Sequence, residues 1–232
     1  MKEEIREKDI YHLYQPIYDL NKFEVIGYEA LLRTTQSDNP EQVFKEAKKE
    51  GYLYWLDTVS IQKAIHKFIR TKEYRQDHYL FLNVYPSTLI NPNFLEFIDE
   101  FSNLNLNITL EINESEAVED IKELVLQSDY LKNRNILLAI DDVGKGSSEL
   151  VKIIELHPEI IKIDANITQA FNHSKEKTLL IKLLIKYCKE LQIRLILEGI
   201  EEIDTLFSIR DNGAVYGQGY LLGRPSNLTL LN

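Results

Sequence analysis

Short apolar runs alternate along the chain with longer stretches of helical period. Eight of these runs are rich in β-branched and aromatic residues, which is typical of buried strands. They read HLYQPIY, FEVIGYEALL, YLFLNV, NITLEI, NILLAI, EIIKI, IRLILE and GAVYGQG. Apolar residues recur with helical spacing between them, including over 40–70, 92–101, 118–131, 147–156, 175–191 and 201–212. The alternation predicts an α/β fold, and eight strands predict a TIM-like (β/α)8 barrel.

The first two predicted strands are separated only by the segment DLNKF. A parallel crossover needs a dozen or more residues, so this pair is expected to form an antiparallel hairpin. The barrel should therefore have an antiparallel first strand. A chain of 232 residues fits one such barrel. We expect a polar lead over residues 1–10 and a single barrel domain over 11–232.

Composition and charge narrow the classes of function. Hydrophobic residues make up 44% of the chain and charged residues 28%, as in a soluble globular protein. The formal net charge of −10 argues against a sequence-independent nucleic-acid binder, and an anionic substrate would need local cations. Cys188 has no second cysteine to bridge, and the N-terminus resembles neither a signal peptide nor an anchor. We expect a cytoplasmic protein with no membrane contact.

Polar residues stand at the carboxyl ends of the predicted strands. In a parallel barrel these ends meet at one mouth, where the functional site lies. The end residues are Glu29, Asn83, Glu111, Asp141 with Asp142, Lys162, Glu198 and, after the last weak strand, Gln218. If the barrel is right, carboxylates from four strands converge.

Clustered carboxylates need a counter-charge, because two of them about 4 Å apart repel by roughly 1 kcal/mol in water and about 4 kcal/mol at an intermediate dielectric. Oxygen ligands from Asp, Glu and Asn suit Mg²⁺ or Mn²⁺ better than zinc. Asp141 is the candidate to bridge two such ions, which together would clamp a nucleophilic water and a leaving oxygen in phosphodiester hydrolysis. Asp142 reaches the same site only if the chain turns, and Gly144 and Gly146 supply that turn. Lys162 would stabilise developing negative charge.

Taken singly, each of these residues has a simpler structural interpretation. Glu29 reads as a strand-edge charge, Asn83 as a turn residue, and Lys162 with Asp164 as an ion pair. Glu114 reads as a solvated residue beside a helix cap at Ser115. Their joint position after successive strands favours a shared site.

The ordered motifs YQPIYD, YEALLR, FLNVYP, LEINES, IDDVGKG, IKID, EGIEE and GQGYLLGRP resemble those of the EAL-domain cyclic di-GMP phosphodiesterases. The resemblance spans roughly residues 11–225 and implies a TIM-like barrel with an antiparallel first strand. It also implies cleavage of one phosphodiester bond of the cyclic dinucleotide, with linear pGpG as the product. The cofactors implied are two Mg²⁺ or Mn²⁺ ions per site, with Ca²⁺ expected to inhibit.

The resemblance also implies roles for individual residues. Glu29, Asn83, Glu111 and Asp141 would hold the first metal, and Asp141 would be shared with a second metal assisted by Asp142 and Glu198. Lys162 would hold the attacking water, and Gln218 would support the site near Glu198 and Glu201. Arg33 would bind a substrate phosphate, with Leu32, Gln15 and Arg224 along the substrate groove. Glu114 would stabilise the loop over residues 143–148.

This sequence departs from the family pattern beside the expected ligands. It has Asn113 where the family usually has Thr, Val143 for Phe, Lys145 for Thr and Leu197 for Ala. An isolated loop charge such as Lys145 usually faces solvent, although contact with a substrate phosphate is the alternative. The family often forms homodimers through the barrel side near the fifth and sixth strands.

Three hypotheses about function follow. The first is an active cyclic di-GMP phosphodiesterase, because every expected acid is present. The second is a receptor that binds the same dinucleotide with negligible turnover, which the loss of a metal-binding acid would have favoured. The third, an unrelated metal-dependent barrel enzyme, is disfavoured by the motif order and by Arg33 close to Glu29.

Overall fold

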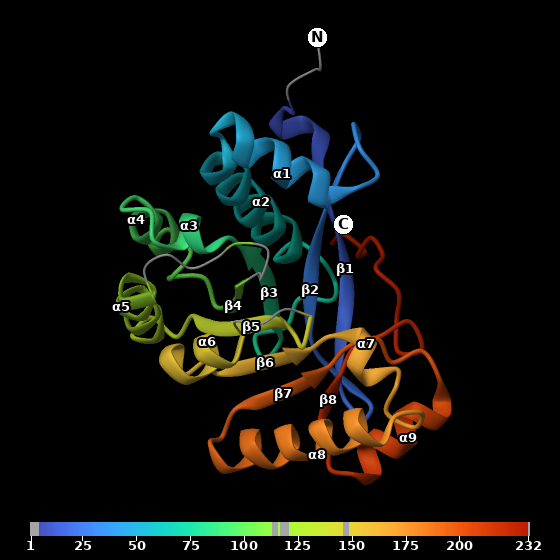
Figure 1. Cartoon of the computed structure of the whole chain (residues 1–232). Helices are drawn as coiled ribbons and strands as arrows, with labels where there is room; N and C mark the ends of the chain where they lie inside the picture. The colour runs from blue at the N-terminus through green and yellow to red at the C-terminus, as the bar shows by residue number, and fades with distance from the viewer. Residues whose placement is uncertain (1–4, 113–115, 117–120, 146–148, 232) are drawn as a thin grey trace.

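The computed structural model describes residues 5–112, 116, 121–145 and 149–231. The strands in these residues close into a barrel with the order β1 to β8, and helices surround it (Figure 1). The strands are β1 (Ile10–Asp19), β2 (Glu24–Thr34), β3 (Tyr79–Val84), β4 (Asn107–Ile112), β5 (Leu137–Val143), β6 (Ile160–Ile163), β7 (Arg194–Leu197) and β8 (Tyr216–Gly217). The predicted α/β barrel of eight strands is confirmed.

The direction of β1 is opposite to that of the other strands. It pairs antiparallel with β2 over its full length and with β8 at its end, whereas neighbouring strands from β2 to β8 run parallel. The loop between β1 and β2 is too short for the crossover that a parallel pair needs, so the two strands form an antiparallel hairpin. This confirms the antiparallel first strand.

The helices lie on the outside of the barrel (Figure 1). They are α1 (Pro40–Glu50), α2 (Leu53–Phe68), α3 (Pro86–Leu89), α4 (Phe94–Asp99), α5 (Ile121–Lys132), α6 (Glu149–Leu156), α7 (Ala165–Thr168), α8 (Lys175–Glu190) and α9 (Ile203–Asp211), after a short 3₁₀ turn at Glu7–Asp9. Within the described residues, none of these helices combines the length and the apolar character that crossing a bilayer requires.

The helical stretch predicted over 40–70 consists of two helices. Asn39 begins α1 by accepting hydrogen bonds from the backbone N–H groups of Glu41 and Gln42, and Pro40 fits the first turn. Gly51 ends it in the left-handed conformation, with φ of 82°. The chain then starts α2 at Leu53 in a new direction, and α1 lies above the carboxyl end of β2.

The position of Glu29 differs from the prediction that it ends its strand. β2 continues for five residues beyond Glu29, to Thr34, and stays paired with β1 over that length. Its pairing with β3 covers only Gly27 to Ala30. The last part of β2 therefore stands above the barrel mouth, with one edge free of β3, and forms a wall beside α1.

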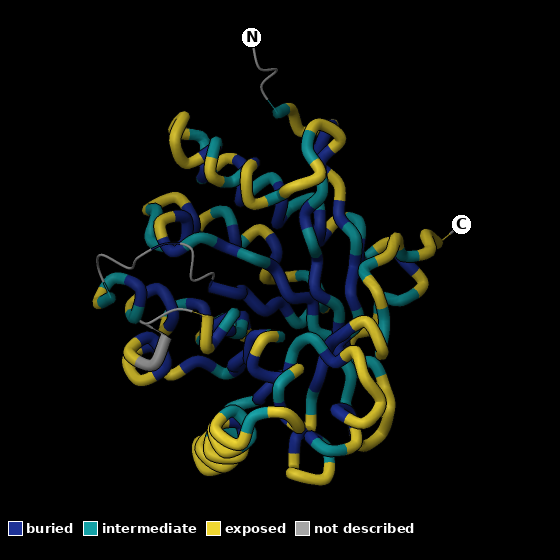
Figure 2. The backbone as a smooth tube through the Cα atoms, turned by 45° about the vertical axis from the view of Figure 1, so that its right-hand side comes forward, coloured by how far each residue is buried: buried dark blue, intermediate teal, exposed yellow. Residues whose placement is uncertain are grey.

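Burial separates the barrel from its surroundings. In Figure 2 the strands run as a mostly buried centre, and exposed residues lie on the outer sides of the helices. Inside the barrel, apolar side chains from five strands form one cluster: Ile17, Phe81, Ala139, Ile160 and Ile196. This layer closes the barrel below the mouth.

Candidate functional site

A polar layer lies directly above the apolar layer inside the barrel. Side chains alternate between the two faces of a strand, so the residue two positions beyond an inward apolar residue also points inward. Two positions beyond Phe81 in β3, Ala139 in β5, Ile160 in β6 and Ile196 in β7 stand Asn83, Asp141, Lys162 and Glu198, respectively. Because β1 runs the opposite way, its polar residue, Gln15, stands two positions before Ile17. The layer comprises Gln15, Glu29, Asn83, Glu111, Asp141, Lys162, Glu198 and Gln218. One polar residue from each strand, or from the position just after it, therefore faces the mouth.

The ammonium group of Lys162 lies at the centre of this layer. Among the described residues, its Nζ is 2.7 Å from Glu198 Oε1, 2.8 Å from Glu111 Oε1, 3.2 Å from Asp141 Oδ1 and 3.3 Å from Glu29 Oε2. The Lys162 side chain is fully buried. Four carboxylates thus share one cation, and they lie close enough together to share others.

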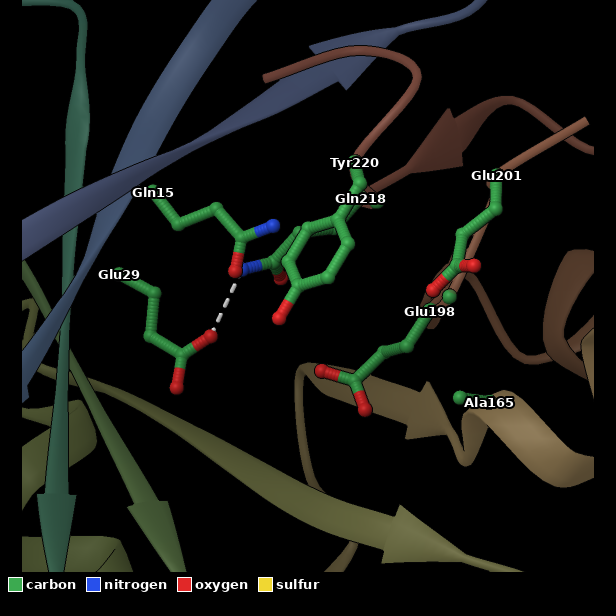
Figure 3. A pocket seen from close by; sticks show the side chains of 9 residues that line it. Gln15, Glu29, Ala165, Glu198, Glu201, Gln218 and Tyr220 are labelled. Carbon is green, nitrogen blue, oxygen red and sulfur yellow. Dashed lines mark hydrogen bonds between the residues drawn. The ribbon is translucent and has the colours of Figure 1, made fainter. Parts of the chain in front are cut away.

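Two side-chain amides orient Glu29. Gln218 Nε2 donates a hydrogen bond of 2.8 Å to Glu29 Oε2, drawn as a dashed line in Figure 3. Asn83 Nδ2 donates to Glu29 Oε1 at 3.3 Å and is 3.5 Å from Glu111 Oε2. These bonds hold the Glu29 carboxylate in a fixed direction above the apolar layer.

A β-bulge brings Asp142 to the site beside Asp141. The register between β5 and β6 shifts between Ile140 and Val143. Asp142 has φ of 56°, a left-handed conformation that Asp tolerates better than most residues. The turn expected at this pair is present at Asp142 itself and continues through Gly144; Gly146 lies outside the described residues.

The carboxylates form two groups that share Asp141. Ligand atoms of Glu29, Glu111 and Asp141 lie within 4.8 Å of one another, and so do those of Asp141, Asp142 and Glu198. A carboxylate common to two such groups has the placement of a ligand that bridges two ions.

Burial and crowding shift the pKa values of the cluster. Burial raises the pKa of Glu198 to about 8; the attraction of Lys162 lowers it in part, and repulsion from Asp141 and Glu29 adds to the rise. Burial also raises the pKa of Glu111 well above its usual range and that of Asp141 in the same direction. The cluster therefore binds protons readily when no other cation neutralises it.

Glu29 and Lys162 are shifted toward their charged forms. Burial alone would raise the pKa of Glu29, but Lys162 and the hydrogen bonds from Gln218, Lys162 and Asn83 lower it overall. Burial would lower the pKa of Lys162, but the surrounding carboxylates raise it well above its usual range. Glu29 thus stays ionised beside neighbours that tend to hold protons.

The donor set fits hard divalent cations. It consists of carboxylate oxygens and the amide of Asn83, which are the ligands that Mg²⁺ and Mn²⁺ prefer. The raised pKa values of Glu111, Asp141 and Glu198 indicate a deficit of positive charge at the mouth. Gln218 Oε1 is also buried without a hydrogen bond from the described residues. Bound cations would supply the missing charge.

Two cavities open on either side of the carboxylates, and both are lined by Glu29 and Glu198. The larger, of about 650 Å³, lies between the end of β2, the helix α1 and the turn at Asp142, and Arg33 lines it. The smaller, of about 200 Å³, is also lined by Gln15, Glu201, Gln218 and Tyr220. Figure 3 shows Glu29 and Glu198 approaching the smaller cavity from opposite sides.

The structure brings most of the predicted substrate residues to these cavities. Arg33 and Leu32 line the larger one and Gln15 lines the smaller one, together with Glu201, which is predicted to lie near Glu198 and Gln218. Arg224 lines neither; its guanidinium lies over the ring of Tyr220, a residue of the smaller cavity, 4.2 Å from the ring centre. Glu114, predicted to stabilise the neighbouring loop, lies outside the described residues.

Several residues of the cavities were not identified from the sequence. Phe44, Lys45 and Lys48 of α1 line the larger cavity, because β2 projects far enough for α1 to cover its end. Tyr220 lies within the quoted motif GQGYLLGRP and lines the smaller cavity. Lys145, for which solvent exposure or contact with a phosphate is expected, is about half exposed, lines the larger cavity and also forms an ion pair with Asp142.

Comparison with known proteins assigns this barrel to a family. The EAL domain model matches residues 1–225, and the chain belongs to that family. The probable cyclic di-GMP phosphodiesterase PdeG of Escherichia coli (strain K12) is 26% identical over 235 residues, which cover 97% of this chain and 46% of PdeG. The chain thus spans less than half the length of that relative.

Solved structures share the fold. The cyclic di-GMP complex of the PaMucR phosphodiesterase has a TM-score of 0.83 and 22% identity, covering 94% of this chain and 92% of that one. The manganese and cyclic di-GMP complex of BlrP1 from Klebsiella pneumoniae, at pH 9.0, has a TM-score of 0.85 and 24% identity, covering 97% of this chain and 58% of BlrP1. At these identities the likeness establishes the barrel.

Proposed function

We propose that this chain is a metal-dependent phosphodiesterase that hydrolyses cyclic di-GMP to linear pGpG. The observation that carries the proposal is the pair of carboxylate groups joined at Asp141, beside the buried Lys162 and a cavity lined by Arg33. The description of PdeG as a probable cyclic di-GMP phosphodiesterase supports this choice of substrate.

Two divalent cations, Mg²⁺ or Mn²⁺, fit the site. Glu29, Asn83, Glu111 and Asp141 would hold one ion, and Asp141, Asp142 and Glu198 would hold the other. When bound, such ions lower the pKa of a coordinated water and neutralise charge on the transferring phosphoryl group. Gln218 and Asn83 would keep the Glu29 carboxylate aimed at the ion, since both already donate to it.

Lys162 would have two tasks in the proposed reaction. Its ammonium is buried among the carboxylates, so it stays charged and limits their mutual repulsion. Once metal ions share these carboxylates, the same group can donate hydrogen bonds to the attacking water or to a phosphoryl oxygen. The water oxygen bonds to phosphorus, one P–O ester bond breaks, and the leaving oxygen takes a proton, which gives the linear dinucleotide.

The surroundings suit a dianionic cyclic dinucleotide. Arg33 lies four residues beyond Glu29 on the same face of β2, so its guanidinium stands above the metal-binding layer. It would bind a phosphate, for which a guanidinium offers paired donors. The cavities on the two sides of the carboxylates would each receive one base, with Gln15, Glu201 and Tyr220 in the smaller cavity. Glu201 and Gln218 would support Glu198 from that side.

The test is a chromatographic assay for pGpG with purified protein, Mn²⁺ and cyclic di-GMP. Glu29→Ala should abolish product formation while the circular dichroism spectrum stays unchanged. Glu24→Ala is the matched control, because it makes the same change at the exposed start of the same strand. Product formation by the Glu29→Ala protein at the wild-type rate would overturn the proposal. Binding of the dinucleotide by the wild type without product would indicate the receptor hypothesis instead.

We also propose a homodimer formed through one side of the barrel. Val151 and Ile154 on α6 and Leu179 and Leu183 on α8 are apolar side chains that are 56% to 59% exposed. These helices follow the neighbouring strands β5 and β6. Sedimentation should show a dimer that Leu183→Lys converts to monomer. An unchanged dimer in that variant would exclude this face. We propose the cytoplasm as the location, because Cys188 is a free, buried cysteine with no second cysteine to bridge, as is usual in a reducing compartment.

A further inference from the structure

Lys145 contacts a residue that the proposed function assigns to the second metal. Its Nζ lies 3.1 Å from Asp142 Oδ2. Asp142 belongs to the carboxylate group that it forms with Asp141 and Glu198. We propose that Lys145 acts as an internal competitor for the second divalent cation, so that this cation must displace the Lys145 ammonium from Asp142. The inference rests on the proposed two-metal function.

Local backbone geometry holds the two side chains together. The N–H of Lys145 donates a hydrogen bond of 3.1 Å to the carbonyl oxygen of Asp142, so the turn is closed by the main chain as well as by the ion pair. Gly144 has φ of 105°, and a Cβ there would lie 2.0 Å from Ile167 Cδ1. The turn therefore packs against α7 in a backbone conformation that residues other than glycine rarely adopt. Asp142 and Lys145 meet because of that conformation.

The ion pair is placed where a cation can exchange with it. The Asp142 side chain is 22% exposed and that of Lys145 is 48% exposed, so water and ions reach both. Lys162, by contrast, is fully buried and lies among the carboxylates on the inner side of the cluster. The two lysines thus neutralise opposite sides of the same group, and the outer lysine is the one that a metal entering from the larger cavity meets.

Competition of this kind would weaken the second metal site without removing a ligand. A divalent ion that coordinates Asp142 has to break the pair with Lys145 and also meets repulsion from the nearby ammonium. Asp142, the carboxylate that Lys145 contacts, belongs to the second group and not to the group formed by Glu29, Glu111 and Asp141. The effect should therefore fall on the second ion and set the concentration at which the enzyme becomes fully loaded.

The test measures Mn²⁺ binding in the absence of substrate. Isothermal titration calorimetry and the electron paramagnetic resonance signal of free Mn²⁺ both report the binding. The variants are Lys145→Met, which removes the charge at similar length, and Lys145→Arg, which keeps it. Lys22→Met is the control, because Lys22 lies in the turn between β1 and β2 at the opposite end of the barrel. Lys145→Met should tighten the weaker of two Mn²⁺ sites by about two- to fivefold, the range expected for a partly exposed ion pair.

The outcomes separate this inference from the proposed function. Wild-type behaviour of Lys145→Arg and Lys22→Met, with tighter binding by Lys145→Met, supports the competition. Two Mn²⁺ sites with unchanged or weaker binding in Lys145→Met would overturn the competition alone. An equal gain in Lys22→Met would also overturn it, because the effect would then come from net charge. Fewer than two Mn²⁺ ions on the wild type would overturn the two-metal function itself.

Discussion

At the scale of single residues, Lys162 decides the charge balance of the barrel mouth. Its ammonium contacts the carboxylates of Glu29, Glu111, Asp141 and Glu198 in a fully buried position. When one member of a buried cluster of charges is removed, the remaining charges are left without compensation. This loss destabilises the fold by more than the intact ion pairs stabilise it. Replacing Lys162 by an uncharged residue should therefore lower the stability of the fold, whatever its effect on catalysis.

We predict that Lys162→Met lowers the free energy of unfolding by about 3–5 kcal/mol at pH 8 in EDTA. Urea unfolding followed by tryptophan fluorescence measures it, with Lys22→Met as the control. Mn²⁺ should recover part of the loss, because it supplies the missing positive charge. Lower pH should recover part as well, since raised carboxyl pKa values favour the folded state where these groups are protonated. Equal urea midpoints for variant and wild type in EDTA would contradict the charge argument.

His12 gives a prediction about pH. Its Nε2 lies 2.9 Å from Ser60 Oγ in the interior. Burial lowers the pKa of His12 to about 3, with added repulsion from Lys67, Lys63 and Arg33. An unfolded chain titrates histidine near 6.5, so between these values it binds a proton that the folded protein excludes. The stability that His12 contributes is present above pH 6.5 and falls as the pH drops, by at most about 1.4 kcal/mol per pH unit.

Urea unfolding at pH 7.5 and pH 5.0 isolates this effect. His12→Leu should lose less stability between the two pH values than the wild type does. His173→Leu, which changes an exposed histidine, should behave as the wild type. Parallel pH dependence in all three proteins would show that His12 does not stay neutral in the folded state.

Much of the polar layer can be predicted from the sequence, because each strand carries its polar residue after an apolar run. Glu111, Asp141, Lys162 and Glu198 are recognisable in this way. The contacts of Lys162 with these three carboxylates and with Glu29 cannot be predicted, because they depend on the barrel radius and on the side-chain rotamers. Lys145 has no periodic pattern around it, and its pairing with Asp142 follows from the positive φ angles of the turn.

At the scale of elements, the alternation of apolar runs predicts all eight strands, because a strand buried on both faces has few polar residues. It does not predict where the pairing between two neighbouring strands ends. β2 runs five residues past Glu29 since β1 pairs with it throughout, and this extension produces the wall that carries Arg33. The short helices α3 and α7 have four residues each, too few for a helical period to show.

Two glycines, one after β8 and one after α1, distinguish steric overlap from backbone strain as causes of instability. A Cβ at Gly219, just after β8, would lie 2.2 Å from the backbone N and O of Ile200, so Gly219→Ala has to move the main chain beside Gln218. We predict a loss of more than about 2 kcal/mol in urea unfolding and a large loss of pGpG formation. Gly51→Ala is the control, because Gly51 has φ of 82° but open space around it.

That control should cost only about 1–2 kcal/mol, the strain of a left-handed alanine, and should leave the pGpG assay unchanged. A Gly219→Ala protein as stable and active as the Gly51→Ala protein would mean that the end of β8 adjusts freely. The position of Gln218, which donates to Glu29, would then not depend on close packing of this turn.

At the scale of the whole molecule, charge is distributed unevenly. The chain has a formal net charge of −10, and among the described residues the larger cavity is lined both by cations and by carboxylates. The cations are Arg33, Lys45, Lys48 and Lys145, and the carboxylates are Glu29, Glu41, Asp141, Asp142 and Glu198. An overall negative field slows the approach of an anion, and these carboxylates oppose it inside the cavity until other cations neutralise them. Metal ions bound to the carboxylates would leave the local cations in excess, so metal binding and dinucleotide binding should strengthen each other.

Mn²⁺ and Ca²⁺ should therefore have the same effect on stability and opposite effects on hydrolysis. Both bind oxygen ligands and relieve repulsion among Glu111, Asp141 and Glu198, so each should raise the melting temperature, with about 2.7 kcal/mol gained at 100 times Kd. Ca²⁺ takes a larger and more flexible shell, so it should inhibit pGpG formation in competition with Mn²⁺. Differential scanning fluorimetry and the chromatographic assay measure the two effects on one preparation, with Glu29→Ala expected to show a smaller thermal shift. Stabilisation by Ca²⁺ without inhibition would argue against the two-metal geometry, and no stabilisation by either ion would mean that the carboxylates hold protons rather than metals.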